Sequence, residues 1–215
     1  MRNVTRIINI LEQYYYKERR TTLNRMRKRP NAFKILISCL ISLRTKDETT
    51  EKISKELFKI ADTPKKIAGM NLKRLEKILY SSGYYKNKAK TVKHVASVIL
   101  KKYKGKVPSS EEELLSIKGV GRKTANIVLC FAYNKSVIPV DVNVHRVANR
   151  LGWVKTKNPY ETELELMKII PKEYWKEING LFLLHGKKIC VAISPFCSKC
   201  PVKNYCRRVA VTKSR

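Results

Sequence analysis

The sequence predicts an all-α protein, and three observations point to that class. Apolar residues recur at steps of three and four along most of the chain, as they do on the buried face of a helix. No stretch shows the strict alternation of apolar and polar residues that is typical of a half-buried strand. Proline, glycine and asparagine separate the periodic segments at intervals that suit about ten short helices.

Apolar stripes define most of the expected helices. In the segment NKAKTVKHVASVILKKY the stripe occupies one side and lysines fill the opposite side. Its members are Ala89, Val92, Ala96, Ile99 and Tyr103. Similar stripes predict helical segments within residues 32–43, 53–60, 72–79, 144–151 and 164–170.

A further helix should begin near Glu111 and end before a tight hairpin. Ser110 and Glu113 form a capping-box pattern, in which the two side chains satisfy backbone N–H groups at the start of a helix. Gly119 and Gly121 then supply the backbone freedom that a hairpin needs.

The second helix of this hairpin is expected directly after Gly121, where its first backbone N–H groups would face an approaching anion. Two glycines alone are also typical of an ordinary helix-turn-helix corner. Lys118, Arg122 and Lys123 surround them, and this cluster of cations favours a site for phosphate. Val120 would fill the space between the two helices.

Lys123 lies near the start of that helix, where amide dipoles, Arg122 and burial in a cleft would each disfavour an ammonium ion. A neutral amine is a nucleophile that can form a Schiff base. Asp141 follows 18 residues later, at the expected N-cap of a helix starting near Val142. Capping alone would stabilise that helix by about 1 kcal/mol. The same carboxylate could take the proton of the lysine and stabilise positive charge on a sugar carbon.

Four of the six cysteines fall within the last 26 residues, with the spacing C-x6-C-x2-C-x5-C. A zinc ribbon would show two C-x2-C pairs, whereas four thiolates in one compact loop favour a [4Fe-4S] cluster. Structural zinc is the alternative. These candidate ligands are Cys190, Cys197, Cys200 and Cys206. Cys39 and Cys130 have apolar neighbours and are expected in the core.

The chain has 47 basic and 17 acidic residues among 215, a formal charge of +30. Self-repulsion on this scale favours a polyanionic partner, of which nucleic acid is the most common. A lysine-rich genome or an anionic membrane surface would also account for some of the charge. We expect no membrane span and a cytoplasmic protein, because no apolar run approaches about 20 residues and the N-terminus lacks a signal peptide.

In their order and intervals these motifs resemble the endonuclease III family of helix-hairpin-helix DNA glycosylases and AP lyases. The resemblance runs from about residue 30 to residue 206 and rests on GVGRKTAN, on the Val-Asp pair beyond it and on the cysteine spacing. It implies that Lys123 attacks C1′ of a damaged nucleotide and that Asp141 is the catalytic carboxylate. It also implies that Lys118 to Gly121 bind phosphate and that the four cysteines hold the cluster.

The same resemblance implies two helical domains with DNA in the groove between them. Residues 25–135 would form a six-helix, barrel-like domain containing the hairpin at 114–131. Residues 1–24 and 136–215 would form the iron-sulfur domain. The expected protein is a monomer associated with the nucleoid of a prokaryote, and its richness in lysine and isoleucine suggests an archaeal one.

The implied activity is that of a bifunctional enzyme, which releases oxidised pyrimidines from double-stranded DNA and nicks damaged or abasic sites by β-elimination. Lys123 carries this interpretation, because adenine-specific mismatch glycosylases share the cysteine loop but lack a lysine here. The alternatives are a monofunctional glycosylase for mismatched or alkylated bases and a non-catalytic iron-sulfur protein that binds DNA.

Two positions depart from the bacterial pattern. Where bacterial members carry a glutamine that fills the hole left by the flipped base, this chain has Arg44. The second wedge is usually leucine, and here it is Tyr84, whose ring can stack between bases. Plain surface-loop residues are the alternative for both positions.

The loop between the first two cysteines, VAISPF, also lacks the cations that bacterial relatives place there. Lys199 is the first candidate to replace them as a contact to DNA phosphates. The other candidates are Lys203, Arg207 and Arg208.

Overall fold

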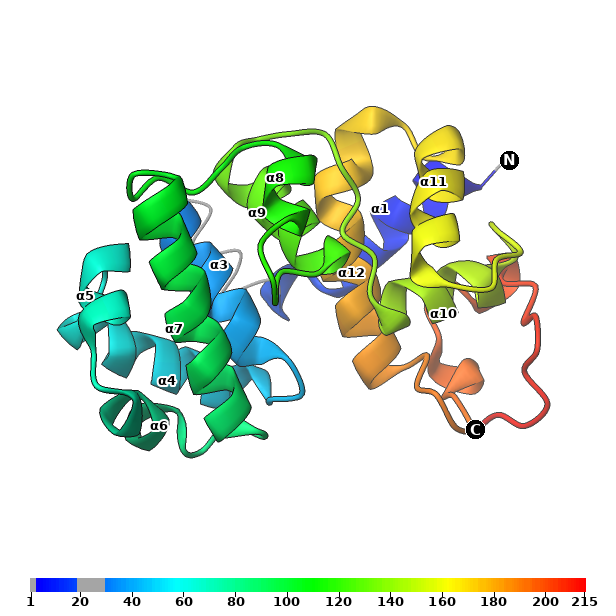
Figure 1. Cartoon of the computed structure of the whole chain (residues 1–215). Coiled ribbons are helices and arrows are strands. Elements are labelled where there is room, and N and C mark those ends of the chain that lie inside the picture. The colour runs from blue at the N-terminus through cyan, green and yellow to red at the C-terminus, as the bar shows by residue number, and fades with distance from the viewer. Residues whose placement is uncertain (1–2, 19–29) are drawn as a thin grey trace. The chain divides into compact units, whose positions relative to one another are not determined.

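The computed structural model describes residues 3–18 and 30–215, and every regular element in these ranges is a helix (Figure 1). The all-α class is therefore confirmed. The described residues form two compact units, which we call the hairpin unit (30–135) and the cysteine unit (3–18 and 136–215). The domain boundary expected between residues 24 and 25 lies outside the described residues. Within them, no helix has the length and apolar content to cross a bilayer.

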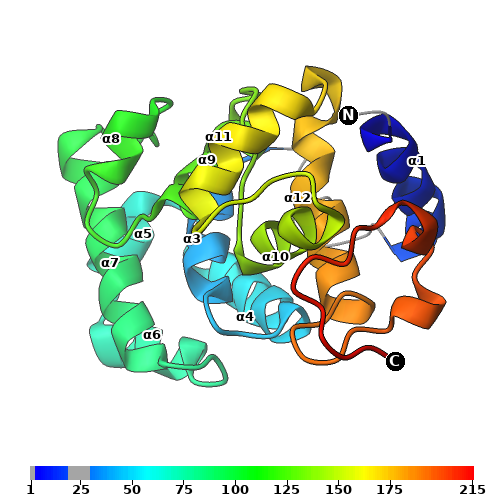
Figure 2. The ribbon, with the colours of Figure 1, turned by 90° about the vertical axis from the view of Figure 1, so that its right-hand side faces the viewer.

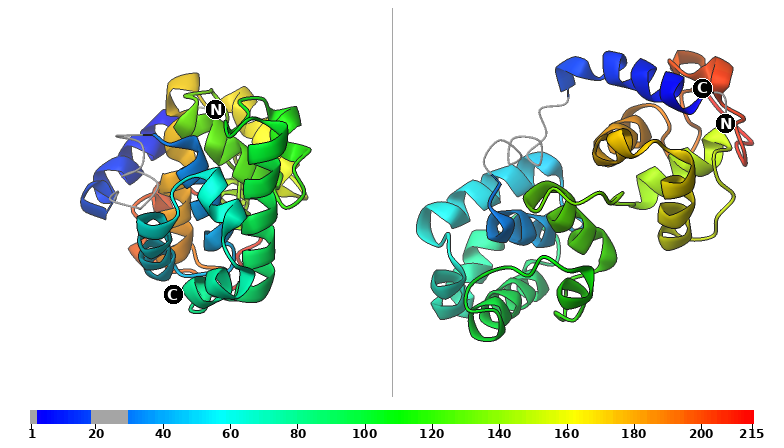
Figure 3. Two further views of the ribbon diagram at one scale, coloured as in Figure 1. Left: turned by 60° about the vertical axis from the view of Figure 1, so that its left-hand side comes forward. Right: turned by 90° about the horizontal axis from the view of Figure 1, so that it is seen from above.

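The hairpin unit is built around one almost fully buried helix, α3. This helix packs against α4, α7 and α9, and α7 in turn packs against α5 and α6 (Figure 3). Its sequence, AFKILISCLIS, has only one charged residue, so it can be enclosed on most sides. The helices are α3 Ala32–Ser42, α4 Asp47–Ile60, α5 Pro64–Gly69, α6 Leu72–Leu79, α7 Tyr85–Lys102, α8 Glu111–Leu115 and α9 Arg122–Ala132.

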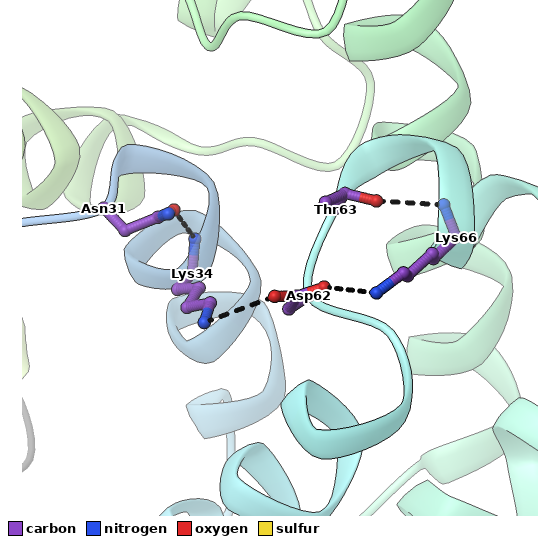
Figure 4. Close-up of polar contacts among 5 residues, drawn as sticks. All are labelled: Asn31, Lys34, Asp62, Thr63 and Lys66. Carbon is purple, nitrogen blue, oxygen red and sulfur yellow. Dashed lines mark hydrogen bonds and ion pairs between the residues drawn. The ribbon is translucent and has the colours of Figure 1, made fainter.

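Three helices of this unit meet at Asp62, directly after α4 (Figure 4). The Asp62 carboxylate lies 2.9 Å from Lys66 Nζ of α5 and 3.8 Å from Lys34 Nζ of α3. The hydrogen bond from Lys66 lowers the pKa of Asp62. Asn31 caps α3 by accepting the Lys34 N–H at 2.9 Å, and Thr63 caps α5 by accepting the Lys66 N–H at 3.3 Å. The chain's own side chains therefore fix this junction.

Side chains also close other helix ends of the hairpin unit. Lys93 of α7 donates through Nζ to the carbonyl oxygens of Ala68, at 2.8 Å, and Met70, which end α5. A cation suits that position because the last carbonyls of a helix carry partial negative charge. At α8, Ser110 Oγ accepts the Glu113 N–H at 3.2 Å, so the predicted serine cap is confirmed, whereas the Glu113 carboxylate accepts from the Ser110 hydroxyl at 2.8 Å.

The cysteine unit has one core, in which α12 packs against α1 and α10 (Figure 2). Buried residues from both ends of the described chain meet there, among them Ile8 of α1 and Phe182 of α12. The α-helices are α1 Val4–Tyr14, α10 Val142–Leu151, α11 Pro159–Ile169 and α12 Trp175–Lys188. The 3-10 turns are η1 Tyr16–Glu18, η2 Lys172–Tyr174, η3 Cys197–Lys199 and η4 Lys203–Tyr205.

Candidate functional site

The hairpin between α8 and α9 uses its two glycines for different purposes. Gly119 has φ +99°, and a Cβ at this position would lie 2.6 Å from Thr91 Cγ2 of α7. Val120 is buried, and its place between the two helices stays a prediction. Gly121 has an ordinary φ of −89°, and nothing lies within 4 Å of where its Cβ would be. The fold therefore requires Gly119, whereas Gly121 leaves the start of α9 open.

The cations around these glycines differ in their surroundings. Lys118 is exposed, whereas Arg122 and Lys123 are half-buried. Arg122 Nη1 forms an ion pair with Glu111 Oε1, which ties the start of α9 to α8. Nothing in the sequence pattern indicates this structural role of Arg122. Contacts of Lys118 and Arg122 with DNA stay predictions.

Lys123 stands on the first turn of α9, over the buried helix α3. Burial raises the pKa of the Cys39 thiol in α3 to about 12, and the charge of the nearby Lys123 opposes part of this rise. Because α3 packs along α9, the backbone that carries Lys123 is rigidly supported. A half-buried primary amine on a fixed helix start, next to the open Gly121, is well placed to act as a nucleophile.

Asp141 caps α10, as predicted. One carboxylate oxygen, Oδ1, accepts the N–H groups of Asn143 at 2.8 Å and Val144 at 3.0 Å. The residues before it are held too, because buried Asn179 of α12 donates to the Pro139 carbonyl at 2.7 Å. Both cap bonds therefore fix the Asp141 carboxylate through Oδ1, and neither involves Oδ2. Lys123 belongs to the hairpin unit and Asp141 to the cysteine unit, and their joint action stays a prediction.

The structure brings Arg44 and Tyr84 together, although 40 residues separate them. Arg44 Nη1 donates to Tyr84 Oη at 3.2 Å, and the guanidinium carbon lies 5.3 Å from the centre of the Tyr84 ring. Both side chains are exposed, and both residues have left-handed backbones, with φ of 53° and 58°. Non-glycine residues rarely adopt this conformation, so the pair stores strain at the surface.

The four cysteines near the C-terminus line a single cavity of the cysteine unit. The cavity also includes Arg150 of α10 and His185 of α12. The loop that carries the cysteines contains only the short turns η3 and η4 (Figure 2). The sulfur-bearing residues are Cys190, Cys197, Cys200 and Cys206, all half-buried.

Hydrogen-bond donors reach two of these sulfur atoms. Arg150 Nη1 lies 3.5 Å from Cys190 Sγ, and the backbone N–H of Arg208 lies 3.4 Å from Cys206 Sγ. Arg150 also donates to the carbonyl oxygens of Val191, at 2.7 Å, and Ala192, at 2.8 Å. Arg146 of α10 also donates to the Cys190 carbonyl, at 3.0 Å, so two arginines of this helix hold the start of the cysteine loop.

A hydrogen-bonded chain leads from α1 to a third cysteine. Tyr15 Oη lies 3.1 Å from Nδ1 of His185, which is 2% exposed, and His185 Nε2 lies 3.7 Å from Cys200 Sγ. If the Tyr15 hydroxyl donates to Nδ1, then Nε2 carries the ring proton and points it at the sulfur. Nothing in the spacing of His185 from the cysteines indicates this contact.

Burial raises the pKa of the Cys200 thiol to about 11 and also raises the pKa of Cys206. Both would be protonated without a metal, and coordination would displace the proton. Among residues 3–18 and 30–215, no three His, Cys, Asp or Glu side chains converge closely enough to hold one metal ion. The thiols instead surround the cavity.

The cations proposed to replace the missing charges of the cysteine loop are exposed. Lys199 ends the turn η3, and Lys203 Nζ reaches the Ser198 carbonyl at 3.4 Å. Arg207 packs against Gly152, where a Cβ would lie 2.4 Å from Arg207 Cδ. Their contacts with phosphates stay predictions.

Residues 37–172 match the model of the HhH-GPD superfamily base excision DNA repair proteins. An endonuclease III from Thermotoga maritima is 45% identical over 182 residues, which cover 85% of each chain. A solved endonuclease III trapped as a covalent intermediate with DNA is 35% identical, with a TM-score of 0.78, and the match covers 92% of this chain and 96% of that one.

A thermostable thymine-DNA glycosylase has a TM-score of 0.81 at 24% identity, with 94% of both chains covered, and shares the fold. Family, fold and motifs therefore agree. The chain belongs to the endonuclease III family of the HhH-GPD superfamily.

Proposed function

We propose that this protein is a bifunctional DNA glycosylase and AP lyase of base excision repair, acting on oxidised pyrimidines and abasic sites in double-stranded DNA. The observation that carries this proposal is Lys123, a half-buried amine on the first turn of α9, next to the open Gly121. The trapped covalent complex of an endonuclease III that is 35% identical supports a covalent mechanism.

The reaction needs a neutral amine and a base to remove its protons. Asp141 takes a proton from the Lys123 ammonium, and the freed amine attacks C1′ as the bond between C1′ and the damaged base breaks. The base leaves with the electron pair and is then protonated. The nitrogen then loses another proton, and the C1′–O4′ bond breaks as O4′ takes up a proton, which opens the sugar ring and leaves a protonated imine between Lys123 and C1′.

The imine then permits strand scission. It makes the C2′ proton acidic, and loss of this proton forms a C2′–C3′ double bond as the 3′-phosphate departs with its electron pair. Water hydrolyses the imine and releases Lys123. Because Asp141 is held by the two cap bonds to Oδ1, its position does not depend on the substrate.

Borohydride reduction of the imine tests this mechanism. With a duplex that contains thymine glycol, the wild-type protein should form a covalent adduct with DNA, and Lys123→Gln should form none. Asp141→Asn should keep its cap but lose about 10²- to 10⁴-fold in rate. Lys101→Gln, an exposed lysine of α7, is the matched control. Unchanged trapping in Lys123→Gln would exclude Lys123 as the nucleophile.

Separate assays of base release and nicking distinguish the alternatives. A bifunctional enzyme releases the base and cuts the strand in one incubation. A monofunctional glycosylase for mismatched or alkylated bases would release the base and leave the strand intact until alkali is added. A non-catalytic protein would bind the damaged duplex without either product.

We also propose that Cys190, Cys197, Cys200 and Cys206 hold a [4Fe-4S] cluster. In support, all four thiols line one cavity, and donors from Arg150 and Arg208 point at two of the sulfur atoms. A single zinc ion would require every Sγ at about 2.3 Å from one point. When bound, the cluster would supply iron-thiolate bonds that fix the loop.

Iron and sulfide analysis together with visible absorbance tests the cluster. Four irons and four sulfides per chain support it, whereas a colourless protein with one zinc would replace it with the zinc alternative.

We assign binding of the DNA to three parts of the chain. The hairpin of Lys118, Gly119, Val120 and Gly121 would hold a phosphate on the N-terminus of α9. Arg44 and Tyr84 would enter the base stack, and Lys199 would contact a phosphate near the cysteine loop. The place of action is then the cytoplasm, on nucleoid DNA.

A further inference from the structure

Lys88 of α7 is a buried lysine with no part in the proposed reaction. It is 7% exposed, whereas most lysines of the chain lie on the surface. No carboxylate in the described ranges pairs with it, and its Nζ donates to the Thr45 hydroxyl. Burial lowers the pKa of Lys88 to about 8. A buried cation without an anionic partner costs stability, and the hydrogen bond to Thr45 is the side-chain contact that offsets part of this cost.

Thr45, the hydrogen-bond partner of Lys88, also bonds to the residue on the other side of Arg44. The Thr45 hydroxyl, which accepts from Lys88, lies 3.4 Å from the Leu43 carbonyl and donates to it. Leu43 and Thr45 are the two neighbours of Arg44, whose φ is 53°. The hydrogen bonds from Lys88 through Thr45 to Leu43 therefore bracket a residue with a strained backbone.

The segment that carries Tyr84 leads directly into the first turn of α7, on which Lys88 stands. The Lys88 backbone N–H donates to the Tyr84 carbonyl at 3.0 Å and forms the first turn of α7. Tyr84 occupies the N-cap position of α7 with a left-handed backbone, and its side chain makes no capping bond. Serine, aspartate or asparagine would suit that position better, so the fold gives up a cap in order to place a tyrosine there.

The two segments also touch directly. A Cβ on Gly83 would lie 3.0 Å from the Arg44 carbonyl oxygen, so the loops approach too closely for a larger residue to fit without adjustment. The side chains of Arg44 and Tyr84 also hydrogen-bond to each other, so the two segments contact each other through both backbone and side chains. Strained, exposed residues persist where the surroundings fix them, and the Lys88 side chain ties the first turn of α7, which follows Tyr84, to Thr45 beside Arg44.

We propose that Lys88 is a positioning residue that holds Arg44 and Tyr84 as one preformed wedge for insertion into DNA at the lesion. This inference rests on the proposed function for the insertion itself. Lys88 touches neither substrate nor the reacting atoms. It acts by keeping the two loops in the conformation that the bent duplex requires, which avoids ordering them during binding.

Lys88→Met and Thr45→Val remove the donor and the acceptor with little change in volume. Each should raise KM, and the Kd for a duplex with a stable abasic analogue, by about tenfold, with a smaller effect on kcat. The double variant should be no weaker than either single one, and Lys88→Arg should restore part of the affinity. Lys101→Met, on the same helix, is the matched control.

A double-mutant cycle shows whether Lys88 acts through the wedge. In an Arg44→Ala, Tyr84→Ala background, Lys88→Met should have no further effect on Kd. An equal loss of affinity with and without the wedge would overturn the proposal, as would unchanged Kd in a folded Lys88→Met. If Lys88→Met fails to fold, Thr45→Val carries the same test.

Hydrogen exchange of the free protein separates this proposal from the proposed function. Without DNA, Lys88→Met and Thr45→Val should speed amide exchange in residues 43–46 and 82–85, and leave α9 unchanged. Faster exchange in a protein that cleaves no damaged duplex would retain the support by Lys88 and reject the repair activity. Unchanged exchange in these segments would reject the support whatever the activity.

Discussion

The hairpin between α8 and α9 is a tight turn between two helices, whereas the loop of the four cysteines contains only two short turns between residues 189 and 215. In the hairpin, Val120 is buried, Gly119 packs against Thr91, and Arg122 pairs with Glu111. In the cysteine loop, Arg146 and Arg150 of α10 bind backbone carbonyls, and the four thiols line a cavity together with His185. The first region is built from packed side chains and an ion pair, whereas the second gathers four thiols around a cavity.

This difference separates two ways of building a functional site. A site that must admit DNA repeatedly gains from a backbone that is already in place, because ordering it would weaken binding. A site that retains its cofactor can leave part of its stability to that cofactor, because binding free energy then becomes folding free energy. We therefore expect substitutions in the two regions to affect different properties.

Removal of a cysteine ligand should have the largest effect on stability. Cys200→Ala should abolish the visible absorbance of the cluster and destabilise the protein by about 3 kcal/mol or more, which lowers Tm by roughly 10 °C. Cys130→Ala is the matched control, since Cys130 is buried in α9 of the hairpin unit. It should keep the absorbance and cost only about 1 kcal/mol. Equal Tm values for the two variants would contradict the proposed dependence on a cluster.

The two glycines of the hairpin should differ from each other next. Gly119→Ala must adopt φ near +99° and displace Thr91, a stiff β-branched residue, so it should cost about 1–3 kcal/mol. Gly121→Ala meets no atom and should change the free energy of unfolding by less than about 1 kcal/mol.

Gly121→Ala should weaken DNA binding although it hardly changes stability. Gly121→Ala places a methyl group where a phosphate would approach, so a stable protein should bind a lesion duplex about tenfold more weakly. Thermal unfolding and Kd, measured on the same preparations, check both statements. Full affinity in Gly121→Ala would remove the phosphate from the start of α9.

The sequence predicted these regions unequally. Spacing alone identified the hairpin, the cap by Asp141 and the group of four cysteines, because these features are local or depend on residue type. It did not indicate Arg150 or His185 at the cysteine cavity, since a tertiary contact leaves no periodic trace in one sequence. Lys88 was equally hidden, because it is one lysine among many.

Helix boundaries show the same limit. The apolar stripe at 53–60 belongs to a helix that begins earlier, at Asp47. The stripe misses the first six residues because all of them are polar. The six-residue α5 is too short to show a stripe and is recognisable only by Thr63 and Pro64 at its start. Periodicity therefore reports which residues are buried, and caps are needed to report where a helix starts.

The smallest expected effect compares the two regions as contacts for DNA. Lys118 of the hairpin and Lys199 of the cysteine loop are both exposed, so replacing either by alanine should hardly change stability. If each neutralises one phosphate, each replacement should make the slope of log Kobs against log salt shallower by about 0.9. Lys55→Ala, which removes a surface ion pair with Glu51, is the control and should keep the wild-type slope. A changed slope for Lys118→Ala alone would confine phosphate binding to the hairpin, because Lys199 would then contribute no counterion release. Equal changes for both variants would mean that Lys199 also neutralises a DNA phosphate, although the VAISPF segment of the cysteine loop carries no cation.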